Sequence, residues 1–435
     1  MVFLATSLPL HQQTFSLDHR AWVEILATTP NLLVIQDLDG VCMDLVANPL
    51  DRRIDLDYVQ ATQAFEGHFY VLTNGEHTGT RGVNPIVERA WGGREAVVSN
   101  EGYLPGLAAG GVQWQSRSGQ VSHPGVSRAE LEFLAAVPEQ MRQRLTDFWR
   151  QRPGLLPETA VSQGIAAAVL DNLASPTVNL NTLQAQLQAA GDHDGSIYAD
   201  LQRAMADLMA DLLNQAATQG LGDSFFVHYA PNHGRRADGQ EELWLGEGAE
   251  SGTTDFQFMV RGAIKEAGVL ALLNRYYADK TGEFPLGEGF NVRQAPQHLP
   301  ELLALAEAHF DPLLMPTLVG VGDTVTSRWI MEKEGQPTVQ RGGSDRLFLQ
   351  LIQDLGDRFK RGNLVTYVDS SGGQVKNRKA LKLGHHNGRI VVTEGPADPR
   401  DTADPLRLNV VFPGGHRQYC AAFQTAAQHR RPING

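Results

Sequence analysis

Short runs of apolar and β-branched residues recur in the first quarter of the chain, with amphipathic stretches of helical spacing between them. Each run ends in polar or glycine residues, as a buried strand does where it meets its loop. The runs of the first quarter lie at 31–36, 68–74 and 95–102. The pattern returns late in the chain at 317–323, 363–369, 389–395 and 408–415. This alternation predicts an α/β fold with a parallel sheet and a site at the carboxyl ends of its strands.

The middle of the chain has a different pattern. After a glycine-rich stretch at 103–125, long segments with helical spacing lie at 127–152 and 181–220. Candidate strands follow at 224–230, 241–247 and 255–262. A mixed α/β block therefore interrupts the parallel sheet. The sequence predicts a core made of residues 1–103 and 263–435, with an inserted α/β cap domain at 104–262.

Composition and charge narrow the class of protein. The 435 residues are 42% hydrophobic and 20% charged, which fits a soluble globular protein of two domains. The net charge of −12, without a dense basic block, argues against a nucleic acid or an anionic membrane as partner. Only Cys42 and Cys420 are present, so no disulfide framework is expected and a cytoplasmic location fits best.

Candidate chemistry begins directly after the first apolar run, in the segment Asp37-Leu38-Asp39-Gly40. Side chains alternate along an extended segment, so both carboxylates are expected to point to one region. One carboxylate can attack phosphorus, and the other can protonate the leaving group and then activate water. Two carboxylates and a phosphate together call for a divalent cation, and Mg²⁺ prefers such oxygen ligands. A solvated strand end is the alternative for this segment taken alone.

Three further features favour phosphoryl transfer. Thr73 and Asn74 end the second apolar run and offer donors to phosphate oxygens, although a plain turn has the same residues. Lys265, in the first turn of an amphipathic helix, can neutralise a carboxylate and a phosphate, although a single helix lysine is usually solvated. Asp323 follows a buried run and can bind Mg²⁺, or it can instead cap a helix.

In this order, the four motifs resemble those of the haloacid dehalogenase (HAD) superfamily. The long gap between Thr73 and Lys265 falls where members with a C2-type cap insert their lid. The resemblance implies a HAD-like Rossmannoid core with Asp37 as nucleophile and Asp39 as general acid and base. Asp37, a backbone carbonyl of Asp39, and Asp323 would hold Mg²⁺.

The resemblance also gives roles to the remaining motif residues. Thr73 and Asn74 would bind the substrate's phosphate, and Lys265 would support its charge. Many members carry a second acidic residue soon after the Gly-Asp motif, but this chain does not. Thr326, Ser327 or the more distant Asp345 is the candidate replacement.

Within the superfamily, the chain resembles the glucosylglycerol-phosphate phosphatases, the salt-tolerance phosphatases of cyanobacteria. The segments that carry this similarity are QDLDGVCMDLV, VLTNGEHTG, GVGDTVTSRW and RGGSDRLFLQLI. The resemblance implies Mg²⁺-dependent hydrolysis of 2-O-glucosyl-glycerol 3-phosphate to the osmoprotectant glucosylglycerol. It also names the synthase that makes this sugar phosphate as a candidate partner.

Alternatives stay open at this level. The substrate can be trehalose, sucrose or mannosylglycerate phosphate, and a mutase or a non-catalytic sugar-phosphate-binding protein would keep the same fold. A serine hydrolase is disfavoured because the chain has no Gly-x-Ser-x-Gly, and a dinucleotide site because Val325 replaces its third glycine. Substrate selection is expected in the cap, where His228, Asn232, Glu242 and Trp244 are candidate sugar contacts, although ordinary surface and packing roles are commoner.

Overall fold

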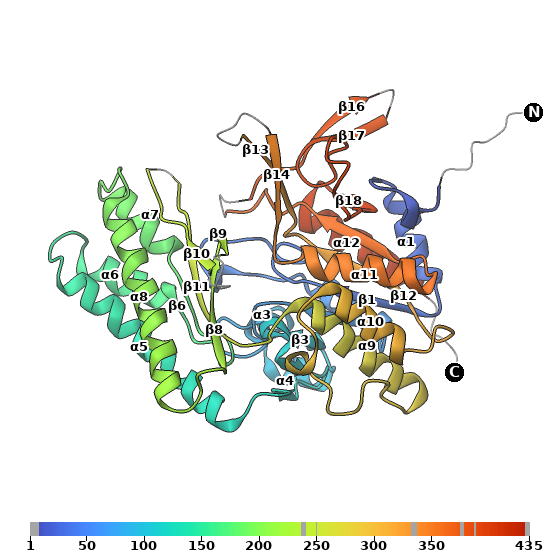
Figure 1. The fold of residues 1–435 in the computed structure, drawn as a ribbon, viewed down its shortest axis with the longest axis horizontal. Helices are drawn as coiled ribbons and strands as arrows, with labels where there is room; N and C mark the ends of the chain where they lie inside the picture. The colour runs from blue at the N-terminus through green and yellow to red at the C-terminus, as the bar shows by residue number, and fades with distance from the viewer. Residues whose placement is uncertain are drawn as a thin grey trace, which may run out of the picture.

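The computed structural model describes residues 8–235, 241–248, 250–331, 337–374, 378–386 and 389–430. Figure 1 shows two lobes, with a large α/β lobe that contains both ends of the described chain and a smaller lobe formed by the middle of the chain. The larger lobe is built on an eight-stranded sheet.

The large sheet has the order β18-β15-β12-β1-β2-β3-β4-β5. Its strands are β18 (Val410–Phe412), β15 (Leu364–Val368), β12 (Thr317–Gly322), β1 (Leu32–Gln36), β2 (Phe69–Leu72), β3 (Gly106–Ala108), β4 (Gln113–Gln115) and β5 (Val121–Ser122). The pairs from β18 to β3 are parallel, and β4 and β5 add an antiparallel edge. Every residue of β1 is buried, as expected for a central strand covered on both faces.

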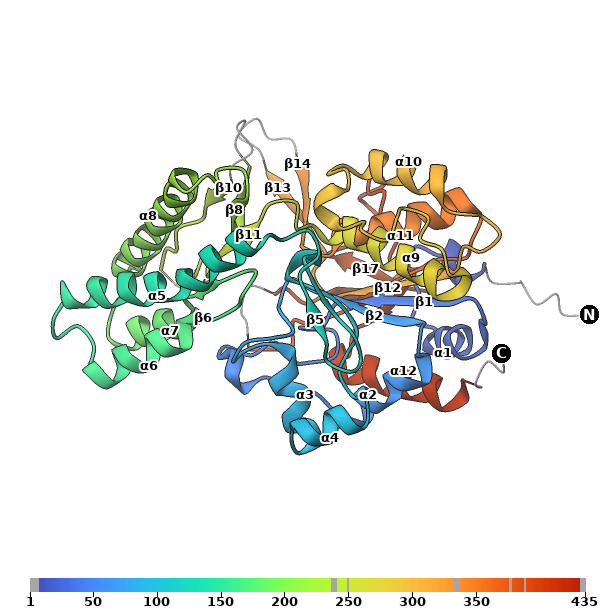
Figure 2. The same ribbon diagram turned by 90° about the horizontal axis from the view of Figure 1, so that it is seen from below.

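Helices cover both faces of this sheet (Figure 2). On one face lie α1 (His19–Thr28), α2 (Leu56–Ala61), α3 (Val83–Trp91), α4 (Arg94–Ser99) and α12 (Gly415–His429). On the other lie α9 (Lys265–Thr281), α10 (Leu299–His309) and α11 (Arg346–Phe359). The alternation of β1 explains the two hydrophobic cores, because Leu32 and Val34 face the first set and Leu33 and Ile35 the second.

The smaller lobe consists of a four-stranded antiparallel sheet and helices. The sheet has the order β6-β7-β11-β8, with β6 (Val169–Leu170), β7 (Thr177–Asn179), β11 (Asp255–Val260) and β8 (Phe225–Ala230). The helices are α5 (Arg128–Arg150), α6 (Glu158–Ala168), α7 (Asn181–Ala189) and α8 (Ser196–Thr218). Stacked rings of Phe133 and Phe225, 5.2 Å apart between centroids, join α5 to the sheet. Ser127 begins α5 with a capping box to Glu130.

Shorter elements complete the described chain. Three hairpins are formed by β9 (Asn232–Arg235) with β10 (Glu241–Leu243), β13 (Thr326–Met331) with β14 (Pro337–Gly342), and β16 (Lys382–His386) with β17 (Arg389–Glu394). The 3-10 helices are η1 (Leu10–Gln12), η2 (Pro49–Asp51), η3 (Thr62–Phe65), η4 (Ala109–Gly111) and η5 (Val292–Gln294).

Two predictions of strands in the large sheet were wrong: one segment is a helix, and the other is a strand outside that sheet. The run at 95–102 contains the helix α4 rather than a strand, because its apolar pair is too short and amphipathic: Val97 is buried and Val98 is 48% exposed. The run at 389–395 contains β17, but this strand pairs with β16 outside the large sheet. In addition, β3, β4 and β5 pair with the large sheet, so that sheet extends to residue 122, beyond the predicted core segment 1–103.

Candidate active site

The ends of three adjacent parallel strands bring the first site residues together. Asp37 follows β1, Thr73 follows β2 and Asp323 follows β12. Their strands are direct neighbours in the sheet. Asp37 continues the ladder through its backbone N–H, which donates to the carbonyl of Val321 at 2.9 Å. Parallel pairing therefore places side chains that are distant in sequence at one edge of the sheet.

Three buried carboxylates form the centre of the site. Oxygens of Asp37, Asp323 and Asp345 lie within 4.8 Å of one another. Asp37 Oδ1 and Asp323 Oδ2 are buried and have no hydrogen-bond partner among the described residues. Buried carboxylate oxygens without donors are costly unless a cation binds them. The donor set is all oxygen, so the trio fits a hard divalent cation such as Mg²⁺.

The pKa values reflect this crowding of acids. Burial raises the pKa of Asp37 to about 7, and the charges of Asp345 and Asp323 add to the rise while Lys265 opposes it. Burial likewise raises the pKa of Asp323 to about 6, with Asp345 adding to the rise and Arg378 opposing it. A bound cation would favour the ionised forms of both groups.

Lys265 provides the positive charge at the centre of the site. It is the first residue of α9, and its Nζ lies 3.0 Å from Asp37 Oδ2 and 2.7 Å from Asp345 Oδ1. Burial alone would lower the lysine pKa, but the two carboxylates raise it above its ordinary value. The lysine is therefore a fixed cation that orients Asp37 through Oδ2, while Asp37 Oδ1 has no donor in the described part of the chain.

Asp345, one of the three candidates for the missing second acidic residue, is the one that lies in the site. Its Oδ2 accepts hydrogen bonds from the backbone N–H groups of Asp323 and Thr324, both at 2.9 Å. Gly322 permits this approach, since a Cβ there would lie 2.8 Å from the Asp345 Cβ. The other two candidates, Thr326 and Ser327, lie on β13, where Ser327 Oγ donates to Asp401 at 3.4 Å.

Asp39 lies outside the trio and has a different partner. Its Oδ1 and Oδ2 accept from Arg52 Nη1 at 3.1 and 2.9 Å, and its side chain is 32% exposed. Gly40 turns the chain here with a φ of +78°, a conformation that suits glycine. A Cβ on Gly40 would lie 2.2 Å from Asp323 Oδ2, so the turn also packs directly on the trio.

Thr73 borders the space beside Asp39, and Asn74 is the next residue in the chain. Thr73 is buried, and its Oγ1 accepts from the N–H of Gly75 at 3.2 Å, while Asn74 is half-buried. A Cβ built on Gly75 would lie 3.6 Å from Thr73 Oγ1 and 3.8 Å from Asp39 Oδ2. Gly75 therefore keeps the space between these two side chains open.

Two arginines near the site were not singled out from the sequence. Arg52 contacts Asp39, and Arg378 Nε lies 4.0 Å from Asp323 Oδ2. Arg378 Nε is also buried without a hydrogen-bond partner among the described residues. Arg378 belongs to a basic cluster that follows β15, and this cluster was the available signal. Arg52 gave no comparable signal, because its role depends on a contact across a loop.

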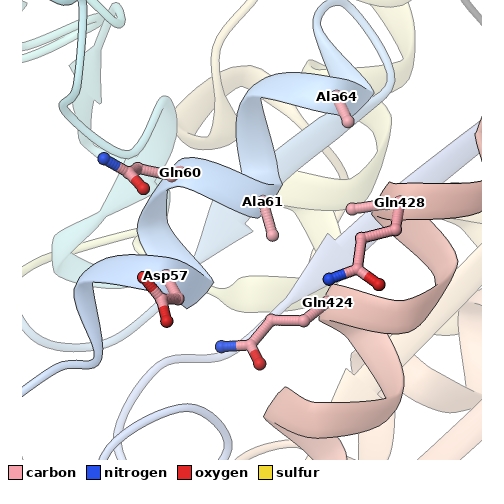
Figure 3. Close-up of a pocket in the computed structure, with 7 residues that line it drawn as sticks. Asp57, Gln60, Ala61, Ala64, Gln424 and Gln428 are labelled. Atoms are coloured by element: carbon pink, nitrogen blue, oxygen red, sulfur yellow. The ribbon is translucent and has the colours of Figure 1, made fainter.

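A separate hollow lies between α2 and α12 (Figure 3). Its volume is about 380 Å³, and its lining consists of Asp57, Gln60, Ala61, Ala64, Gln424, Ala427 and Gln428. None of the trio lines it, and it has one carboxylate and no cation to bind a phosphate. We therefore locate the candidate chemistry at the strand ends. Among the described residues, no helix combines the length and apolar character needed to cross a membrane.

The parallel sheet brings Asp37, Thr73 and Asp323 to one edge, and Lys265 joins them there. Their order in the chain is the one in which the sequence resembles the haloacid dehalogenase superfamily. The family model described as glucosylglycerol-phosphate phosphatase matches residues 31–427. The glucosylglycerol-phosphate phosphatase of Synechocystis sp. is 59% identical over 422 residues, which cover 97% of this chain and 98% of that protein. The chain therefore belongs to the glucosylglycerol-phosphate phosphatase family.

Two solved structures are also similar to the chain. The trehalose-6-phosphate phosphatase of Aspergillus fumigatus is 8% identical with a TM-score of 0.37, and the comparison covers 95% of this chain and 98% of that one. The C-terminal domain of trehalose-6-phosphate phosphatase from C. albicans is 10% identical with a TM-score of 0.42, at the same coverage of both chains.

Proposed function

We propose that the protein is a Mg²⁺-dependent phosphatase that hydrolyses glucosylglycerol 3-phosphate through an aspartyl-phosphate on Asp37. The observation that carries this proposal is the state of the Asp37 carboxylate. Lys265 binds one of its oxygens at 3.0 Å, while the other is buried and accepts from no donor of the residues that the structure describes. A carboxylate held in this way has one oxygen fixed and the other available to attack phosphorus.

The remaining residues divide the work of the reaction. Asp37 Oδ1 forms a bond to phosphorus as the bond to the sugar-side oxygen breaks, and Asp39 gives that oxygen a proton. Asp39 then takes a proton from the water that attacks the aspartyl-phosphate. Phosphate is released and Asp37 is regenerated. Thr73 and Asn74 donate to phosphate oxygens, and Lys265 offsets the negative charge.

Mg²⁺ would be held by the carboxylates of Asp37 and Asp323 and by the backbone carbonyl of Asp39. When bound, it supplies charge neutralisation between phosphate and carboxylates. Asp345 has both oxygens occupied by donors, at 2.7 Å from Lys265 and 2.9 Å from two N–H groups. We assign Asp345 mainly to holding Lys265 and the Asp323 turn in place.

We propose that the cap consists of residues 123–262 and selects the substrate through one polar sheet face. Asn179 pairs with Asp255, and His228 with Gln257, so these four side chains share a face of the small sheet. The alternate positions face the helical side and carry the apolar residues Val178, Phe256 and Phe258. Hydrogen-bonding groups on this face suit a glucosyl group.

Arg378 supports this location for the sugar. Burial raises the pKa of Asp255, and the charge of Arg378 partly opposes that rise. The same arginine opposes the rise of the Asp323 pKa. Arg378 Nε lies 4.0 Å from Asp323 Oδ2, and we propose that it binds the glycerol phosphate beside the acidic trio. The predicted contacts of Asn232, Glu242 and Trp244 stay predictions.

The relative from Synechocystis sp. supports the choice of glucosylglycerol phosphate as substrate. We accordingly propose a role in compatible-solute synthesis and salt tolerance in the cytoplasm. The synthase that forms the sugar phosphate is the candidate partner. These proposals rest on family membership, while the chemistry rests on the acidic trio and Lys265.

The test combines one substitution with a panel of substrates. Phosphate release is measured with glucosylglycerol, trehalose, sucrose and mannosylglycerate phosphates, with and without Mg²⁺. The Asp37→Asn variant should release no phosphate while it keeps its fold by circular dichroism. Asp57→Asn, an exposed acid in the first turn of α2, is the matched control and should keep activity. If Asp37→Asn releases phosphate, Asp37 is not the nucleophile. If the wild-type protein releases phosphate from none of the sugar phosphates, a sugar-phosphate-binding protein is favoured. Preference for trehalose or sucrose phosphate would contradict only the substrate.

A further inference from the structure

Arg52 has an arrangement that the reaction as described does not use. It follows η2, and its side chain is 13% exposed. Nη1 donates to both oxygens of Asp39, and Nε donates to the carbonyl of Pro49 at 3.0 Å. Nη2 donates to the carbonyl of Arg81 at 2.5 Å. A guanidinium with all three nitrogens engaged holds its carboxylate partner in one orientation.

Arg81 connects this arrangement to the cap. Its guanidinium donates to the carbonyls of Ala166 and Val169, at the C-terminal end of α6. The last carbonyls of a helix lack intrahelical donors and carry partial negative charge, so a cation there is favourable. Arg81 therefore binds a cap helix with its side chain and Arg52 with its backbone carbonyl.

Neighbouring contacts show that this part of the core is attached to the cap. The Glu76 carboxylate accepts from the backbone N–H groups of Leu173, Ala174 and Ser175 at 2.7–2.9 Å. Thr80 Oγ1 donates to Asp171 at 2.6 Å. Residues 76–81 are thus held against residues 166–175 at several points. The position of the Arg81 carbonyl depends on how the cap is docked.

We propose that Arg52 is a positioning residue for Asp39 and that cap docking sets the position of Arg52 through Arg81. This inference rests on the proposed role of Asp39 in proton transfer. When the cap is docked, the Arg81 carbonyl fixes the guanidinium, which holds the Asp39 carboxylate facing the space beside Thr73. When the cap moves away, Arg52 loses one anchor and Asp39 loses its fixed orientation. Proton transfer is thereby coupled to closure over the substrate.

The alternative role for Arg52 is direct contact with the substrate's phosphate. The two roles differ in kinetics, because a lost substrate contact raises KM, whereas misplacement of the proton donor lowers kcat. A merely structural role would lower stability without a specific loss of kcat. Steady-state kinetics on folded variants therefore separate the three.

The experiment compares Arg52→Met and Arg52→Lys with Arg53→Met, an exposed neighbour that serves as control. Arg52→Met should lower kcat about tenfold to a hundredfold, part of the full effect of general acid–base catalysis, with KM within about twofold of the wild type. Arg52→Lys should lose less of its kcat than Arg52→Met. A further variant, Arg52→Ala, should regain part of its activity when guanidinium ion is added. Arg53→Met should match the wild type. Urea unfolding of each variant confirms that it is folded.

The link to the cap is tested by a double-mutant cycle with Arg81→Met. Arg81→Met should lower kcat in the wild-type background but cause no further loss in Arg52→Met, because the two residues act in series. If the fold-losses in kcat of the two single variants multiply in the double variant, the link to the cap is wrong. An unchanged kcat or a raised KM in Arg52→Met would overturn the positioning role. Asp39→Asn separates the positioning role of Arg52 from the proton-transfer role of Asp39. If it is inactive while Arg52→Met is normal, only the present inference fails, and if it is fully active, the proposed role of Asp39 itself fails.

Discussion

Asp345 offers a demanding test of how the site is held together, because its carboxylate contacts the lysine and the metal-site turn at once. Its Oδ1 accepts from Lys265 Nζ at 2.7 Å, and its Oδ2 accepts from the N–H groups of Asp323 and Thr324 at 2.9 Å. Asp345→Asn keeps the shape but supplies only one carbonyl oxygen. Whichever way the amide is turned, its NH₂ group meets a donor.

The expected size of the effect follows from these contacts. Removing one partner of a buried ion pair costs about 3–5 kcal/mol. Part of this cost is offset, because the negative charge of Asp345 also repels Asp37 and Asp323 and raises the pKa of both. Removing that charge stabilises the two ionised carboxylates by about 1.4 kcal/mol for each unit by which their pKa falls. We expect a net loss of about 2 kcal/mol in the free energy of unfolding. Because Lys265 loses one of its two carboxylate anchors, kcat should fall about a hundredfold.

The assay measures both quantities on the same preparations. Urea unfolding followed by tryptophan fluorescence gives the free energy, and phosphate release at saturating Mg²⁺ gives kcat. Asp357→Asn is the control on the same helix, because its ion pair with Arg407 is exposed and contributes less than about 1 kcal/mol. An Asp345→Asn protein with wild-type kcat and an unchanged urea midpoint would contradict this role of Asp345.

Three further substitutions probe the site and its surroundings. Gly40→Ala should abolish phosphate release, because its Cβ would meet Asp323 Oδ2 at 2.2 Å; full activity would contradict the close approach. Lys265→Met should lower kcat about a hundredfold or more in the phosphate assay, and a change in KM alone would contradict its role in orienting Asp37. Burial lowers the pKa of His77 to about 4, so the folded state prefers the neutral ring and loses stability as pH falls from about 6.5 towards 4. Urea unfolding at both pH values should show that the free energy of unfolding falls by about 3 kcal/mol less in His77→Gln than in the wild type. An equal fall in both proteins would show that another group is responsible.

The sequence predicted the parts of the site that depend on strand ends. Asp37, Thr73 and Asp323 each follow a buried run, and parallel pairing of those runs was sufficient to bring them to one edge. Lys265 could be predicted because it lies in the first turn of a helix that the sequence indicates. The roles of these residues stay proposals, but their location needed only periodicity and chain order.

Contacts between loops could not be predicted in the same way. Asp345 lies after the β13–β14 hairpin, so nothing in its spacing from Asp323 favoured it over Thr326 or Ser327. Arg52 reaches Asp39 from a 3-10 turn, where no periodicity exists. The helix α4 was mistaken for a strand because two adjacent valines satisfy both patterns over so short a run.

The pairing of β1 with β12 also constrains how the protein is made. Leu32 pairs with Thr317, so about 285 residues must leave the ribosome before β1 gains this neighbour, a delay of roughly 15–60 s at usual rates of synthesis. The inserted lobe is complete in that interval, and its local helices can fold first. Throughout the delay, one edge of β1, a strand of four apolar residues and Gln36, stays unpaired on the nascent chain. The same insertion therefore makes formation of the site one of the last steps of biogenesis.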